Sequence, residues 1–330
     1  GRHGSIAETD AVGVRTAGAA EPISAEKGGA AARSLDRSQK QGNDSASCMI
    51  GLGGGLLTAL AWGGAAVFGA KASRSVGPLA AFAYSNAIAF GIILVVAFAS
   101  AGLPSGDAAD WAWTGLVGLG IVLAFPLTFT ALTIGRIGIV AAVIATDGAM
   151  AAIYAVLTGE ELGRLSAAGL VLAVVGIVLS VLQPAPARSS GPSRDRLAAL
   201  LALAASVCFA ATLVGASQAE SVEPQWVVAT GRGIAFVLAT IPILLVTRAS
   251  LPRAAAPLVA ANGACDVTGF LVFTAVSRDG LAVPAVLGSQ YALVPIFYGV
   301  VAFKERLTPL QWIGVVLTLF GVALVAVSSA

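Results

Sequence analysis

The chain has 330 residues, of which 57% are hydrophobic and only 11% are charged, and its mean hydropathy is +0.89. A soluble globular domain carries about 25% charged residues, so this composition excludes such a domain and indicates a chain surrounded by lipid. The formal net charge of +2 is too small to indicate a nucleic-acid partner.

Three chemical classes are also disfavoured. The only histidine is His3, which removes histidine from any zinc site or proton relay in the body of the chain. No Gly-x-x-x-x-Gly-Lys-Ser/Thr run is present, so ATP is not expected as the energy source. The three cysteines are odd in number and form no disulfide framework. We therefore expect no cofactor and no metal.

Residues 1–48 differ from the rest of the chain. They are polar, rich in Ala, Gly and Ser, and show no apolar period, which predicts a disordered tail. Met49 stands directly before the first apolar segment. Our hypothesis is that residues 1–48 are an upstream extension or an expression remnant without a functional role.

From Met49 onward the chain contains ten apolar segments, each with about the 17–25 residues that a helix needs to cross a ~30 Å hydrocarbon layer. Continuous apolar runs predict helices, because the strands of a membrane barrel alternate. The fold class is therefore an all-α polytopic membrane protein. The segments are roughly 49–70, 77–99, 111–133, 137–157, 165–182, 196–217, 225–247, 254–276, 280–302 and 308–328.

The second half of the chain repeats the first. Residues 129–162 parallel residues 273–307, since both stretches open on Phe-Thr-Ala and close on Glu-x-Leu. The predicted division is a first five-helix repeat at 49–182, a linker at 183–195 and a second five-helix repeat at 196–330. Because five is odd, the second copy must enter the membrane upside down. Inverted repeats are typical of transporters, whose binding site lies where the repeats meet.

Loop charge bears on orientation. Most basic residues lie in the odd-numbered loops, whereas the even-numbered loops hold only Arg164 and Arg278. The positive-inside rule then places the odd loops in the cytoplasm and both termini outside. Six basic residues in the tail oppose this orientation, an objection that disappears if Met49 is the true start. These six are Arg2, Arg15, Lys27, Arg33, Arg37 and Lys40.

The stretch Lys304-Glu305-Arg306-Leu307-Thr308-Pro309, before a final apolar segment, has a weaker counterpart in Gly159-Glu160-Glu161-Leu162. With the opening segment LLTALAWGGAAVF (56–68), it resembles the EamA-type members of the drug/metabolite transporter superfamily. The resemblance covers about residues 56–328. It implies a secondary transporter of small metabolites or amphipathic compounds, an exporter in the cytoplasmic membrane, and it leaves the substrate open. The Glu and Arg of this Glu-Arg-Leu motif are expected to cap, to pair and to fix membrane depth at a helix end rather than to contact substrate.

Three ionisable residues lie at membrane depth: Asp147, Arg232 and Asp266. Each costs at least about 2.5–3.5 kcal/mol to insert, so each needs a partner or a function. One hypothesis is that Arg232 neutralises one aspartate and leaves the other to exchange protons. The alternative is that Arg232 pairs with an aspartate only to hold helices together. Both aspartates are expected to face a water-filled cavity.

Softer polar residues complete the candidate site. Asn262 and Asp266 are four residues apart and share one helical face. Gln290 and Tyr291 occupy the repeat positions of Ala145 and Thr146, which predicts that the fourth and ninth helices line one cavity. Bends at Pro284 and Pro295, on either side, would suit a hinge. The candidate substrate-binding or coupling residues are Asn86, Thr146, Asp147, Arg232, Asn262, Asp266, Gln290 and Tyr291.

The expected activity is alternating-access transport driven by a proton gradient or by the solute's own gradient. The expected partners are a small-molecule substrate and the lipid bilayer, with the chain a monomer or a homodimer. A passive channel is one alternative, which counterflow measurements would distinguish. An integral membrane enzyme such as a lipid-modifying transferase is the other. It is disfavoured because the membrane segments contain no histidine and no Asp-x-x-Asp pair.

Overall fold

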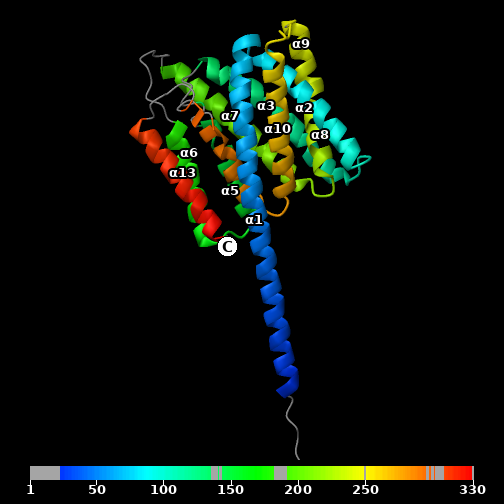
Figure 1. The fold of residues 1–330 in the computed structure, drawn as a ribbon, viewed down its shortest axis with the longest axis vertical. Coiled ribbons are helices and arrows are strands. Elements are labelled where there is room, and N and C mark those ends of the chain that lie inside the picture. Colours follow the sequence, from blue (N-terminus) through cyan, green and yellow to red (C-terminus); the bar gives the residue numbers. More distant parts are fainter. Residues whose placement is uncertain are drawn as a thin grey trace, which may run out of the picture. The chain divides into compact units, whose positions relative to one another are not determined.

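The computed structural model describes residues 23–134, 140, 143–181, 192–248, 250–294, 297–298, 301 and 308–328. These residues form helices and loops and include no strand. The chain divides into two units, residues 1–44 and 45–330. The second unit holds the helical bundle (Figure 1).

The first helix begins inside the stretch for which the sequence predicted a disordered tail. Helix α1 spans Ile23–Val76, so the described part of that tail is helical, while residues 1–22 lie outside the described residues. Residues 23–48 include five Ala, two Arg, two Lys and two Gln, residues with high helix propensity. The prediction of disorder for residues 23–48 was wrong, because it rested on the absence of an apolar period and left out the helix propensity of these residues.

The remaining helices follow the predicted segments. In the first repeat they are α2 (Pro78–Ser100), α3 (Ala108–Ile134), α5 (Asp147–Leu157) and α6 (Arg164–Val181). In the second repeat they are α7 (Pro192–Gln218), α8 (Pro224–Ala235), the π-helical turn η1 (Phe236–Thr240), α9 (Ile241–Thr247), α10 (Ala256–Val276), α11 (Ala282–Gly288), the 3₁₀ turn η2 (Ser289–Ala292) and α13 (Pro309–Ser328). Several begin on proline, which lacks the N–H that a first turn leaves unpaired.

Among the described residues, six helical stretches are long and apolar enough to cross a membrane, judged by length and composition. They are Met49–Val76, Pro78–Ser100, Ala108–Thr128, Arg196–Gln218, Pro224–Thr247 and Ala256–Val276. Three shorter apolar helices are Asp147–Leu157, Arg164–Leu179 and Pro309–Val325. The prediction of ten spanning helices is therefore met only in part by the described residues.

The fourth and ninth segments differ most from the prediction. In the fourth, a turn at Ala145 and Thr146 precedes α5, and in the ninth, α11 passes into the 3₁₀ turn η2 at Ser289. Pro284 lies in the first turn of α11, where its missing N–H is harmless, so it helps to start a helix rather than to bend one. Pro295 lies outside the described residues.

The helix neighbours pair elements of the two repeats (Figure 1). Helix α6 packs along α13, α5 along α11, and α2 along α8, each joining matching segments. Helix α3 also packs on α7. Exchanging the repeats turns this α3–α7 contact into a contact between α10 and α1. This contact is also present, since the Thr58 hydroxyl of α1 donates to the Gly269 carbonyl of α10 at 3.3 Å. The largest buried cluster contains Phe273, Leu287 and Val227 and extends through α2, α3, α5, α6, α7, α8, α10, α11 and α13, so an apolar core joins the two repeats.

Small residues permit the closest of these contacts. A Cβ added to Gly321 of α13 would lie 2.5 Å from the Gly169 carbonyl oxygen and 2.6 Å from the Ala173 nitrogen of α6. Gly169 and Ala173 are four residues apart, the small-residue spacing by which membrane helices bring their backbones together. The pairing of α6 with α13 therefore depends on the missing side chain at Gly321.

We predict that Gly321→Ala lowers the free energy of unfolding in detergent by about 1–3 kcal/mol, the usual cost of overpacking. The matched control is Gly91→Ala, because nothing lies within 4 Å of a Cβ added to Gly91. Thermal unfolding of both purified variants measures the difference. Equal stability of the two variants would contradict the observed closeness of α6 and α13.

Candidate functional site

Arg232, near the end of α8, forms the centre of the site. Its Nη2 lies 2.6 Å from Oδ2 of Asp266 on α10, and the two side chains are 4% and 25% exposed. A guanidinium buried among membrane helices is unfavourable unless a counter-charge and hydrogen bonds compensate it. This ion pair supplies the counter-charge and joins α8 to α10.

The first repeat contributes Asn86 from α2. Arg232 Nη1 donates to Oδ1 of Asn86 at 3.4 Å, and Nδ2 of Asn86 donates to the Thr240 hydroxyl at 3.0 Å. The motif Ile-Ala-Phe recurs at 88–90 and 234–236, and the same offset pairs Asn86 with Arg232. Matching positions of the two repeats therefore meet here. We name Arg232, Asp266, Asn86 and Thr240 the Arg232 cluster.

Thr240 was missed by the sequence reasoning. A regular helix turns by about 100° per residue and would rotate residue 240 by about 80° from residue 232. The π-helical turn at Phe236–Thr240 inserts one extra residue and so brings Thr240 to within about 20° of Arg232. The only signal in the sequence is a lone threonine in an apolar run, followed by Pro242.

Asn262 lies one turn before Asp266 on α10. Its Nδ2 donates to the Ser85 hydroxyl of α2 at 2.9 Å, and that hydroxyl donates to the Val259 carbonyl at 3.3 Å. Asn262 and Asp266 thus both bond to residues of neighbouring helices, in agreement with the face that the sequence assigned to them. Ser85 is a second polar contact that the sequence reasoning did not include.

Asp147 and Thr146 lie apart from this cluster, at the beginning of α5. Asp147 is 8% exposed, and its Oδ1 accepts the Gly148 N–H at 2.7 Å. No ion pair joins Asp147 to any described basic residue. Its place at a helix N-terminus favours negative charge there. The Thr146 hydroxyl donates to the Val143 carbonyl at 2.6 Å and lies 3.2 Å from the Ser206 hydroxyl of α7.

Gln290 and Tyr291 lie in η2, on the side of α5. Gln290 Nε2 donates to the Val286 carbonyl at 2.8 Å, while its buried Oε1 has no partner among the described residues. Tyr291 lies close enough to Asp147 to interact with its charge. Helices α5 and α11 touch at Gly148, where an added Cβ would overlap the Ala285 carbonyl. The predicted pairing of these two segments is observed, and the space between them at Gly148 is filled.

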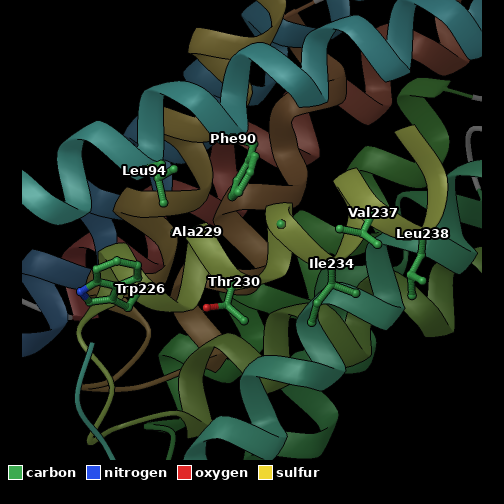
Figure 2. A pocket seen from close by; sticks show the side chains of 9 residues that line it. Phe90, Leu94, Trp226, Ala229, Thr230, Ile234, Val237 and Leu238 are labelled. Atoms are coloured by element: carbon green, nitrogen blue, oxygen red, sulfur yellow. The ribbon is translucent and has the colours of Figure 1, made fainter. Parts of the chain in front are cut away.

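The two cavities described for the bundle have other linings. The larger, about 570 Å³, lies between α2 and the stretch of α8 and η1 (Figure 2). Its lining is apolar apart from Thr230, which suits hydrocarbon rather than a polar solute. The smaller, about 170 Å³, includes Glu160, Glu220 and Arg278. None of the eight predicted site residues lines either of these two cavities. Four of them, Asn86, Arg232, Asn262 and Asp266, lie in or beside the Arg232 cluster. The other four, Thr146, Asp147, Gln290 and Tyr291, lie at the beginning of α5 and in η2.

The glutamate of the first Glu-x-Leu motif acts on a helix end, as the sequence favoured. Oε2 of Glu160 accepts the Leu281 N–H at 2.8 Å, and Oε1 accepts the Ala282 N–H at 3.1 Å. Glu160 therefore caps the N-terminus of α11, across the repeat boundary. Its counterpart Glu305 lies outside the described residues.

We predict that Asp266→Asn lowers the free energy of unfolding in detergent by about 3 kcal/mol, because it leaves the guanidinium of Arg232 buried without a counter-charge. The double variant Arg232→Met with Asp266→Leu should be more stable than Asp266→Asn, since it removes both charges. Asp107→Asn, in an exposed loop, is the matched control. An Asp266→Asn variant as stable as this control would contradict the assigned ion pair.

Comparison with known proteins agrees with this architecture. The family model for the EamA-like transporter family matches residues 49–182 and again residues 196–327. A solved structure, titled only "Crystal structure of protein", is similar in fold, with a TM-score of 0.67 and 17% sequence identity over 86% of this chain and 98% of its own. None of the curated proteins compared matches the chain. The chain is a multi-pass integral membrane protein and belongs to the EamA-like transporter family.

Proposed function

We propose that the chain is a secondary transporter that moves small polar or amphipathic metabolites across the cytoplasmic membrane by alternating access. The observation that carries the proposal is the Arg232 cluster: Asn86 and Arg232, at matching positions of the two repeats, meet in a buried polar site. Transporters built from repeats place their binding sites at such a junction.

Two features support ten spanning segments arranged as inverted repeats. The helix pairs described above exchange when the repeats are exchanged, as a pseudo-two-fold axis requires, and an odd number of segments per repeat would make the second copy inverted. The fourth and ninth segments are both interrupted, at Ala145–Thr146 and at η2. Interrupted helices at membrane depth are tolerated where the freed backbone groups face protein or a wet cavity, and they commonly form transporter sites.

The chemistry of the site suits a carboxylate-bearing solute. Arg232 has a fork of donors, of which Nε has no partner among the described residues, and its counter-ion Asp266 is partly exposed. A planar guanidinium binds carboxylates through two parallel hydrogen bonds. In this mechanism the solute carboxylate displaces Asp266 from Arg232. Asp147, with no cation beside it among the described residues, exchanges the coupling proton.

The first step of the test is to find a solute. A panel of amino acids and organic acids is screened for thermal stabilisation of the detergent-purified protein. The compound with the largest shift is then used in radiolabelled form with proteoliposomes. Counterflow of this compound is expected for a transporter, whereas a passive channel would show none.

We predict that Asp147→Asn keeps counterflow but lowers accumulation driven by a pH gradient at least about tenfold, since proton exchange at one essential group is lost. Arg232→Gln should lower both activities, because it removes the solute contact. Asp107→Asn is the control for loss of an exposed carboxylate. If alanine at both Asp147 and Asp266 left transport and its pH dependence intact, the proposed mechanism would be wrong.

A further inference from the structure

Four connecting segments are tied together at one end of the bundle. They are residues 101–107, 158–163, 219–223 and 277–281, and the segments before α8 and after α10 are visible at the same end in Figure 1. The Asp107 N–H donates to the Ser221 hydroxyl at 2.9 Å, and the Ser221 N–H donates to Asp110 Oδ2 at 2.6 Å. The Glu160 cap on α11 belongs to the same end.

The side chain of Arg278 joins two of these four segments, 277–281 and 219–223. Its Nη2 donates to the Ala219 carbonyl at 3.0 Å and also to the Val222 carbonyl. Ala219 directly follows α7, so the guanidinium lies at a helix C-terminus, where the helix dipole favours a cation. One side chain thus holds the segment after α10 against the segment between α7 and α8.

The electrostatic surroundings favour this placement. Burial lowers the pKa of Arg278, whereas the carboxylates of Glu223, Glu220 and Asp110 raise it. An arginine remains charged at neutral pH under such opposing effects. Arg278 also lines the polar cavity of about 170 Å³, together with Ser217, Ser277 and Glu160. Thr158 and Glu220 in its lining are exposed, whereas Ser217 and Ser277 are buried, so the cavity is a polar surface pocket with a buried floor.

The first repeat does not carry this arginine. The alignment that pairs Phe129 with Phe273 pairs Arg278 with Ile134 and Ser277 with Thr133. The nearest basic residue of the first copy, Arg136, falls at the position of Gly280. By contrast, the glutamate of the Glu-x-Leu motif is present in both copies, as Glu160 and Glu305. The two copies thus share this glutamate in sequence but differ in the arginine.

We propose that Arg278 is the latch of a gate that closes this end of the transport path. Release of its bonds to the Ala219 and Val222 carbonyls opens the buried floor of the polar cavity, at Ser217 and Ser277, to water from this end. This inference rests on alternating access as the proposed function.

The test measures access to the cavity without a substrate. In a background with Cys48, Cys208 and Cys265 replaced by alanine, Ser217→Cys places one thiol in the cavity, at a residue that is 4% exposed. The protein in nanodiscs is labelled with a membrane-impermeant maleimide. Arg278→Gln is expected to raise the labelling rate about tenfold or more, the equivalent of one lost charge-assisted hydrogen bond. Arg278→Lys should lie between wild type and Arg278→Gln.

Two controls keep the result interpretable. Arg164→Gln removes the exposed basic residue that directly follows segment 158–163, and it should leave the labelling of Ser217→Cys unchanged. Ser105→Cys, in an exposed segment, should label equally fast in every background, and unequal rates would indicate a misfolded variant. If Arg278→Gln labels no faster than Arg164→Gln while Ser105→Cys reports an intact fold, the latch is refuted. Absence of counterflow for wild type would instead refute the transport function.

Discussion

The interior of this bundle is organised by the high free energy of ionisable groups in hydrocarbon. Arg232 is almost completely buried, and its charge is matched by Asp266 at 2.6 Å and by hydrogen bonding to Asn86. These contacts fix the relative positions of α2, α8 and α10, because none of the three can move without exposing a charge to an apolar surrounding. The same contacts bring the two repeats together at one point.

Apolar packing around that point is close because small residues line the helix contacts. Gly321 lets α13 approach α6, and Gly148 lets α5 touch α11. In lipid there is little hydrophobic gain in bringing helices together, so close van der Waals contact and interhelical hydrogen bonds supply the attraction. The close contact of Gly148 with Ala285 and Ser289 lies beside both interruptions, because Gly148 follows the turn at Ala145–Thr146 and Ser289 begins η2.

The two repeats differ in one residue of the end that Glu160 caps. The glutamate recurs in the second repeat as Glu305, whereas Arg278 aligns with Ile134 of the first repeat. In the proposed alternating-access mechanism, identical repeats would leave the two conformations equal in free energy, and a difference between the copies removes that equality.

The sequence alone determined the helical class, the two repeats and the membrane setting, since each follows from composition, internal repetition or the length of the apolar runs. It also favoured a helix-capping role for Glu160. Only the tertiary structure decided that Asp266, and not Asp147, pairs with Arg232. The sequence could not choose between the two aspartates, because it does not show which helices are neighbours. The role of Thr240 depends on a π-helical turn, and that of Arg278 on carbonyl groups about 55–60 residues away. Neither has a local signal in the sequence, because both arise from how separate helices pack against one another.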